Sequence, residues 1–99
     1  MSPTFEAANP RFQRDFQQLT LEQRKRFRVA IDQLVEDLKA GRAPRPGLRV
    51  KRVQGAPGVW EMTWAPDGRA TFQYGRELSP GDPHVIWRRV GTHNVFTQP

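Results

Sequence analysis

The sequence contains no cysteine and only two histidines among its 99 residues. Without thiols there is no disulfide framework, no cysteine-ligated zinc site and no thiol nucleophile. His84 and His93 lack the spacing of a metal-binding motif, and no glycine-rich phosphate or dinucleotide motif occurs, so we expect no metal and no cofactor. Long hydrophobic runs and a signal-peptide pattern are also absent. These absences predict a soluble, cytoplasmic protein without membrane contact.

Positive charge is plentiful instead. Sixteen Lys and Arg residues oppose ten Asp and Glu residues, the net charge is +6, and thirteen of the sixteen cations are arginine. Arginine presents a planar fork of donors that matches phosphate or carboxylate, whereas lysine offers a point charge. Scattered cations would serve only solubility, and clustered cations would bind an acidic partner. The positions of the cations therefore decide between these two uses.

Proline and glycine divide a chain of single-domain length (residues 1–99) into a helical first half and a strand-rich second half. Asn9 before Pro10 predicts the start of a short helix, and a capping box over residues 20–23 predicts the start of a second. The second helix has an apolar face at Phe27, Ala30, Ile31, Leu34 and Leu38. Its polar face includes Arg26 and Asp37, which we expect in solvent. The short link predicts a helical hairpin.

Four segments of the second half alternate between apolar and polar residues as strands do, namely 48–53, 59–64, 69–74 and 85–90. The loops favour an antiparallel meander, residues 2–6 would add an edge strand, and His84 is expected in a loop. The core side of the sheet would hold Trp60, Met62, Trp64, Ala70, Phe72 and Tyr74. The outward side would hold Arg49, Lys51, Glu61, Thr63, Arg69, Thr71 and one of Arg88 and Arg89. A one-residue register error would exchange the two sides. The pattern predicts an α+β fold whose open, cationic sheet face holds nucleic-acid phosphates.

The order of these pieces resembles the RelE/ParE superfamily of bacterial toxins. The matching segments are FRVAIDQLVEDL, GLRVKRVQG, GVWEMTW, the turn PDGR before RATFQY, and VIWRRVGTHNVF. The closing G-T-H-x-x-F is similar to the G-T-H-S-D-L-F ending of the YafQ-like branch. The resemblance implies a RelE-like fold of order β-α-α-β-β-β-β, with an N-terminal helical hairpin packed on one face of a small antiparallel sheet.

The same resemblance implies an mRNA interferase, the toxin of a type II toxin–antitoxin system, which cuts the codon in the ribosomal A site. Its partners would be a cognate antitoxin, mRNA and the ribosome. Metal-free cleavage requires the ribose 2′-OH to lose a proton as it attacks phosphorus, the phosphate charge to be stabilised, and the leaving 5′-oxygen to gain a proton. The products would be a 2′,3′-cyclic phosphate and a 5′-OH.

The resemblance assigns three catalytic candidates. His93 stands where the family places a catalytic His, Arg or Tyr, and imidazole is the side chain whose ordinary pKa lies nearest working pH, so His93 is the candidate general acid. Arg69 matches an arginine that follows the turn in several members and would pair with the scissile phosphate, unless it only bridges Asp67. Glu61 would take the 2′-OH proton, unless it only balances the basic sheet. Asp67 is similar to a supporting acidic residue of the YafQ-like branch, although Gly68 replaces the aromatic residue that follows there.

Further cations would bind the phosphates of mRNA and ribosome: Arg49, Lys51, Arg52, Arg88 and Arg89. Phe96 would either stack on a base or pack the end of the chain onto the sheet. RelE has a lysine pair on its middle strand where this chain has Glu61 and Thr63, so the mechanism would rest on histidine, glutamate and arginine instead.

Two other functions share this pattern. A ParE-like inhibitor of DNA gyrase would have the same fold and no nuclease site. A degenerate member would act only as a binding protein. The combination of His93 with Arg69 favours the nuclease over both.

Overall fold

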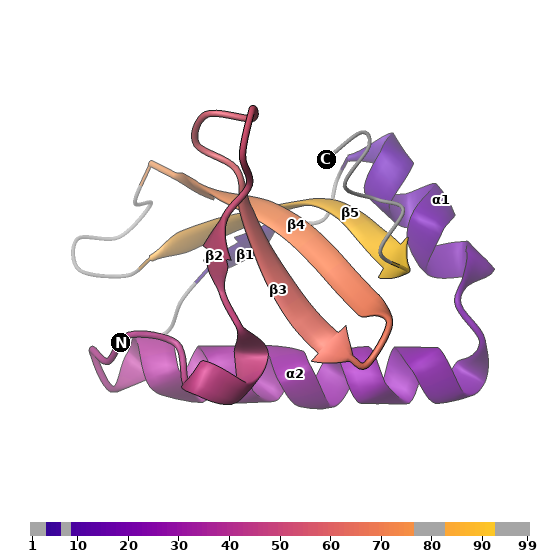
Figure 1. Cartoon of the computed structure of the whole chain (residues 1–99), viewed down its shortest axis with the longest axis horizontal. Coiled ribbons are helices and arrows are strands. Elements are labelled where there is room, and N and C mark those ends of the chain that lie inside the picture. The colour runs from indigo at the N-terminus through magenta and orange to yellow at the C-terminus, as the bar shows by residue number, and fades with distance from the viewer. Residues whose placement is uncertain (1–3, 7–8, 77–82, 93–99) are drawn as a thin grey trace.

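The computed structural model describes residues 4–6, 9–76 and 83–92. Its elements follow the predicted order (Figure 1). They are β1 (Thr4–Glu6), α1 (Pro10–Gln18), α2 (Leu21–Lys39), the 3₁₀ turn η1 (Pro46–Leu48), β2 (Lys51–Arg52), β3 (Trp60–Ala65), β4 (Gly68–Gly75) and β5 (His84–Thr92). His84, predicted in a loop, is the first residue of β5 and is buried. No helix of the described segments is both long and apolar enough to cross a membrane.

Both helices begin where the sequence predicts. The Asn9 side chain accepts a hydrogen bond from the Arg11 backbone N–H at 2.9 Å, and Pro10 occupies the first helical position. Thr20 and Gln23 form the reciprocal capping box, with N···O distances of 2.8 and 3.1 Å. Each such cap stabilises its helix by about 1 kcal/mol because it satisfies an N–H that has no partner within the helix.

The sheet has the strand order β1-β5-β4-β3-β2. Strands β2 to β5 form the predicted antiparallel meander, whereas β1 pairs in parallel with the first residues of β5. Helix α2 runs along the sheet below the strands in Figure 1, and α1 lies beside the end of β5. The helices pack more against the sheet than against each other. The hairpin is therefore open between its two arms.

The core lies between the helices and the predicted inner side of the sheet. Met62, Ala70 and Phe72 are fully buried there, and Trp64 is nearly so. They meet Phe27 and Leu34 of α2, Phe12 of α1, and Val85, Trp87 and Val90 of β5. Burying each large side chain contributes roughly 1.5–3 kcal/mol. Tyr74 departs from the prediction because it is 41% exposed at the end of β4, where its ring contacts those of Trp60 and Phe72 edge-on.

The strand predicted over residues 48–53 is mostly absent. Pro46 and Gly47 open a 3₁₀ turn instead, and Arg49 ends it with a left-handed backbone (φ 47°) while its N–H bonds to the Pro46 carbonyl at 3.0 Å. Only Lys51 and Arg52 pair with β3. The prediction that Arg49 lies on the sheet face is therefore wrong.

A β-bulge separates Arg88 from Arg89. The pairing of β4 with β5 passes from Thr71–Arg89 to Phe72–Trp87, which leaves Arg88 as the extra residue. The bulge lets Trp87 and Val90, three positions apart, both enter the core. Strict alternation could not have predicted this, and for the same reason it could not decide which arginine faces outward.

Candidate nucleic-acid interface

The middle of the outward sheet face carries one row of side chains that crosses four strands, in the order Lys51, Glu61, Thr71 and Arg89. Glu61 is on the predicted side, but it is only 7% exposed, and Lys51 Nζ lies 3.3 Å from its Oε1. Thr71 is fully buried. The charge-balancing role of Glu61 is therefore directly visible as this ion pair, and its role as a base remains a prediction.

The next row contains Thr63, Arg69 and Gly91. Arg69 Nη1 donates to three carbonyls of the β3–β4 turn, those of Gly68 at 2.9 Å and of Ala65 and Pro66 at 3.3 Å. These bonds fix one terminal nitrogen of the guanidinium, because three carbonyl oxygens at the turn converge on Nη1. Arg69 is thus pre-positioned at the end of the sheet, and only part of its surface is exposed.

A groove of about 520 Å³ lies between α2, η1 and the end of β3, and we call it the arginine groove. Three guanidinium-bearing residues from three elements line it: Arg26 of α2, Arg49 after η1, and Arg69 of β4. Thr63 adds a hydroxyl, and none of the described lining residues is a carboxylate. Glu22 lies just outside the lining, with its Oε1 3.6 Å from Arg26 Nε. Such a lining attracts an anion through several charge-assisted contacts.

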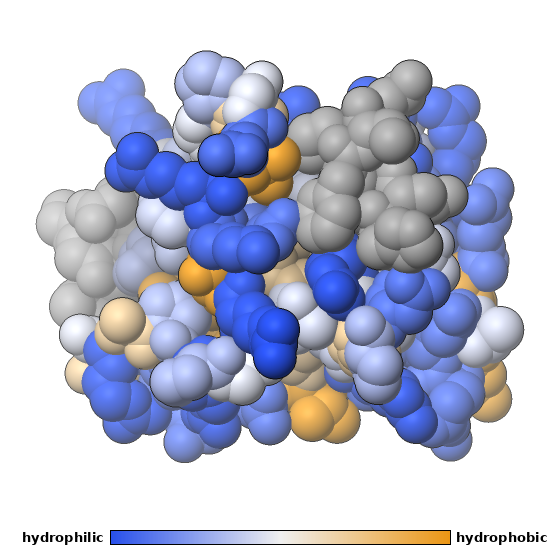
Figure 2. All heavy atoms as spheres, in the orientation of Figure 1, coloured by the Kyte–Doolittle hydropathy of each residue, from blue (hydrophilic) through white to orange (hydrophobic). Residues whose placement is uncertain are grey.

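Arg26 was not predicted as a site residue because it belongs to the polar face of α2, which is typical of a helix surface in solvent. Arg26 is distant from Arg49 and Arg69 in the sequence, and only the fold brings the three residues to the same groove. The side of the molecule shown in Figure 2 is correspondingly hydrophilic over β2 and β3. Arg52 also belongs to this region, where its guanidinium lies 5.2 Å from the centre of the Trp60 ring.

A buried carboxylate supports the groove from below. Asp37 is 2% exposed, so its predicted place in solvent is wrong. Its oxygens accept bonds from Arg45 Nε at 3.0 Å, Arg45 Nη2 at 3.0 Å, Arg42 Nη2 at 2.9 Å and the Arg45 backbone N–H at 2.8 Å. The Arg45 and Arg42 side chains hold the pKa of this carboxyl well below its usual range. The cluster ties the segment before η1 to α2 and so sets where Arg49 emerges.

The two remaining arginines of the predicted RNA surface have protein partners. Arg89 makes a two-point ion pair with Asp15 of α1, at 2.6 and 3.1 Å, and its side chain is 20% exposed. Asp15 also accepts the Val90 backbone N–H at 3.2 Å. Arg88 donates to the Gln73 side chain at 2.9 Å. We therefore treat Arg89 as an anchor between α1 and β5, and we leave it out of the proposed binding surface.

Two predicted residues, His93 and Phe96, lie outside the described residues. Strand β5 ends at Thr92, which pairs with Gly68, and Gly91 pairs with Arg69. His93 thus follows directly on a strand end that adjoins Arg69 in the sheet. Within the described segments, no group of three or more His, Asp and Glu side chains could hold a metal ion.

The YafQ-like branch has an aromatic residue where this chain has Gly68, and the packing around Gly68 explains this difference. A Cβ at this position would lie 2.5 Å from a ring carbon of Trp64, which is buried and lines the arginine groove. No aromatic side chain fits there without moving the tryptophan. The turn of this chain therefore depends on a glycine, and Asp67 stands exposed at its tip.

No protein-family model matches the chain, and no curated protein matches it either. Two solved structures share its fold. A copper-bound mutant toxin from Helicobacter pylori has 20% sequence identity and a TM-score of 0.63, over 95% of this chain and 97% of that one. The Escherichia coli DinJ–YafQ toxin–antitoxin complex gives 15% identity and a TM-score of 0.61, over 96% and 97%. The α+β fold predicted from the resemblance is therefore confirmed.

Proposed function

From a fold shared with two toxins, we propose that this chain is the toxin of a type II toxin–antitoxin system and acts as a ribosome-dependent mRNA endoribonuclease. The observation that carries the proposal is the arginine groove, where Arg26, Arg49 and Arg69 converge next to the strand end that precedes His93. A single-stranded RNA backbone is a matching ligand because it carries one negative charge per nucleotide. The protein would act in the cytoplasm, with mRNA in the ribosomal A site as substrate and a cognate antitoxin as partner.

The proposed roles of Arg69, Glu61 and His93 follow from the charge and the position of each residue. Arg69 would bind a non-bridging oxygen of the scissile phosphate and stabilise the charge that develops there. Glu61 would accept the proton of the 2′-OH as that oxygen forms its bond to phosphorus. Glu61 and Thr63 point to the same side of β3, about 7 Å apart along the strand, so the base and the Arg69 row span roughly one nucleotide. The bond from phosphorus to the 5′-oxygen then breaks, and His93 would donate the proton that the leaving oxygen takes.

His93 carries the sharpest test of this mechanism. Exchanging it for alanine should slow cleavage by at least ~10-fold if it is the general acid. His84→Ala is not a suitable control because His84 is buried, so Arg76→Ala, an exposed change at the far end of β4, serves instead. Primer extension on ribosome-bound mRNA measures the rates. A His93→Ala rate equal to wild type would remove this residue from the mechanism.

A second function is favoured by the burial of Glu61 and its contact with Lys51. A protein that only binds, such as a ParE-like gyrase inhibitor, needs no available base on this face. The two functions separate in one pair of assays with the purified wild-type chain. The nuclease cuts mRNA on translating ribosomes and leaves DNA supercoiling by gyrase unchanged. Inhibition of supercoiling with intact ribosomal mRNA would establish the gyrase inhibitor instead. If the chain is active in neither assay, it is a protein that only binds a partner.

A further inference from the structure

A row of side chains crosses four strands on the helix side of the sheet. Its members pair from strand to strand in the order Arg52, Trp60, Phe72 and Trp87. Phe72 and Trp87 are buried in the core, Trp60 is part-buried, and Arg52 is exposed on the edge strand β2. The aromatic core of the protein therefore continues to the surface at this edge of the sheet.

Tyr74 extends this aromatic surface along β4. It lies two residues beyond Phe72, so both side chains point to the same side of the strand. Its ring packs edge-on against Trp60, at 6.0 Å between centroids and 68° between planes, and against Phe72, at 5.5 Å and 85°. Strand β3 approaches α2 only towards its end (Figure 1), so the helix leaves Tyr74 41% exposed beside the start of β3. The tyrosine ring is thus held at a fixed angle and is open to solvent.

Arg52 places a cation against these rings. Its guanidinium lies 5.2 Å from the centre of the Trp60 ring, where the negative face of the ring attracts it. Within the described segments no carboxylate pairs with Arg52, so its charge is available to a ligand. We call Arg52, Trp60 and Tyr74 together the aromatic corner. It combines two partly exposed rings with one cation that has no ion-pair partner in the described part of the chain.

The chemistry of the aromatic corner matches an unpaired nucleobase with its phosphate. A base stacks on an aromatic ring through its flat face, and a guanidinium binds the adjoining phosphate. A proline-rich peptide also packs on exposed aromatic rings, but it has no anionic group for Arg52. A second copy of this chain is disfavoured as well, because a two-fold contact would bring two Arg52 side chains together. Single-stranded nucleic acid is the ligand that uses both the rings and the charge.

We propose that the aromatic corner is a stacking site for one unpaired RNA base away from the cleaved bond, with Arg52 on the neighbouring phosphate. This inference rests on the proposed function for RNA as the ligand. It adds a contact on the helix side of the sheet, whereas Glu61 and Thr63 face the other side. Trp60 lies about 10 Å along β3 from Thr63, so a single strand that passes over the edge strand β2 can reach both sites. Because every base has a flat face, the site would not select a particular base.

The test measures how the full chain binds a fluorescein-labelled RNA of about ten nucleotides, by anisotropy. Every 2′-oxygen of this RNA is methylated, so that it cannot attack phosphorus and the RNA stays intact. Tyr74→Leu should weaken binding at least ~5-fold because one base loses its stacking partner, and Tyr74→Phe, which keeps the ring, should stay within about two-fold of wild type. Arg52→Gln should weaken binding and lower the slope of log K against log salt by about 0.7. Arg14→Gln, an exposed change on α1, is the matched control and should leave the slope unchanged. Thermal unfolding verifies that all variants fold.

The other outcomes overturn the inference in distinguishable ways. Equal binding by wild type, Tyr74→Leu and Arg52→Gln, or no binding at all, would remove the stacking site, and cleavage of ribosome-bound mRNA by wild type would still uphold the proposed function. An equal loss in Tyr74→Phe and Tyr74→Leu would show that the hydroxyl binds rather than the ring. A polyproline peptide that wild type binds and Tyr74→Leu does not, with RNA binding unchanged, would make the corner a peptide site. Intact ribosomal mRNA together with Tyr74-dependent RNA binding would remove the nuclease and leave the stacking site.

Discussion

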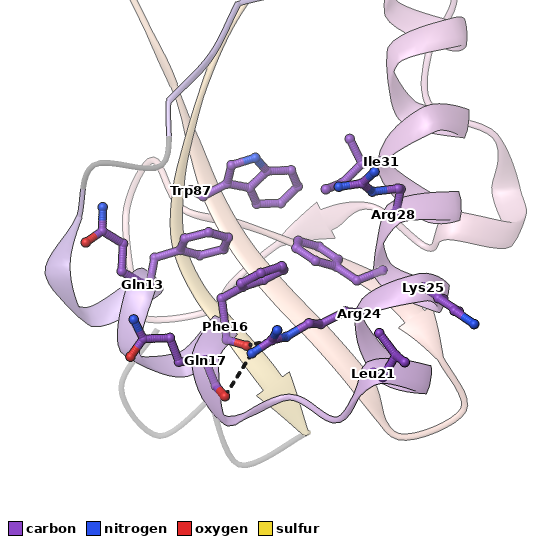
Figure 3. A pocket seen from close by; sticks show the side chains of 11 residues that line it. Gln13, Phe16, Gln17, Leu21, Arg24, Lys25, Arg28, Ile31 and Trp87 are labelled. Carbon is purple, nitrogen blue, oxygen red and sulfur yellow. Dashed lines mark hydrogen bonds between the residues drawn. The ribbon is translucent and has the colours of Figure 1, made fainter.

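Two grooves, one on either side of α2, differ in what lies beneath their cations. One is the arginine groove. The other, of about 810 Å³, opens between α1 and α2, and we call it the helix groove (Figure 3). Its floor consists of the buried rings of Phe12, Phe27 and Trp87.

Helix α2 presents a different set of residues to each groove. Arg26 and Gln33 face the arginine groove together with Val29 and Ala30, and Leu21, Arg24, Arg28 and Ile31 face the helix groove. Both sets recur at three- and four-residue spacing, so one helix presents two separate stripes. The arginine groove has the Thr63 hydroxyl and the buried side chains of Leu48 and Trp64 beside its cations, and the helix groove has a floor of three aromatic rings. A net charge of +6 therefore supplies two surfaces suited to different partners.

In each groove, backbone carbonyl groups hold one arginine in place. Arg69 is fixed by three carbonyls of a β-turn, and Arg24 by two carbonyls at the end of α1. Bonds to neutral carbonyls hold a guanidinium without neutralising it, so its charge remains available to a ligand. Ion pairs do the opposite for Arg45 and Arg89, which the carboxylates of Asp37 and Asp15 retain for the fold. Among these four arginines, the partner thus distinguishes the two structural cations from the two that the grooves present to a ligand.

Arg69→Ala should separate the functions of the two grooves most clearly. Loss of one charge-assisted contact to the phosphate should lower the rate of mRNA cleavage ~10²-fold or more. The family resemblance implies a cognate antitoxin that binds across the helices, and its binding should stay within about two-fold of wild type. Arg28→Glu should give the reverse pattern, with cleavage retained. Single-turnover cleavage and calorimetry measure the pair, and parallel losses in both assays would show that the two grooves are one functional surface.

The fold beneath the arginine groove should be sensitive at one glycine. Gly68→Ala places a Cβ against the buried ring of Trp64 and should destabilise the protein by roughly 1–3 kcal/mol in urea unfolding. Gly47→Ala is the matched control, because its Cβ would meet nothing within 4 Å and its φ is not positive. If both variants unfold at the same urea concentration, Trp64 yields more easily than its packing indicates.

Acid should weaken the support of the arginine groove through Asp37. Its pKa is lowered in the folded state, so the stability it adds is fully present above its ordinary unfolded value of about 4 and is lost as pH falls below that value. Wild type should therefore exceed Asp37→Asn in free energy of unfolding at pH 7, and the difference should shrink towards pH 3. Asp32→Asn, an exposed change on the same helix, should show no comparable trend. Urea titrations at several pH values test this, and a constant difference would mean that the Arg42 and Arg45 contacts do not set the stability.

Sequence predicted the parts of this fold that depend on local periodicity. The two N-caps, the apolar face of α2 and the core side of β3 and β4 follow from spacing and capping chemistry. The bulge at Arg88 and the left-handed Arg49 did not follow, because both depend on how distant segments are joined rather than on alternation. Asp37 looked like any polar helix residue until its arginine partners, five and eight positions later, folded back onto it.

The sequence predicted which types of residue form the candidate site, but it predicted only part of their arrangement in space. Arg69 occupies the expected sheet face, and Glu61 does too, although burial alters its surroundings. Arg26 and Arg49 reach the same groove by routes that no single-element pattern contains, one from a helix and one from a 3₁₀ turn. The helix groove was not predicted at all, because a hairpin of two helices is expected to close. It stays open because Phe12 and Phe27 pack against Trp87 of the sheet.

The most direct test of the central claim is the chemistry of the cut itself. Ribosomes carrying mRNA with ribose throughout, or with a single 2′-deoxynucleotide at the A-site cleavage position, are incubated with the purified chain. We expect the all-ribose message to be cut to a 2′,3′-cyclic phosphate and a 5′-OH, and the deoxy-substituted message to resist cleavage at that position. Equal cleavage of both messages, or products that end in a 3′-OH and a 5′-phosphate, would contradict attack by the 2′-OH and with it the proposed function of the arginine groove.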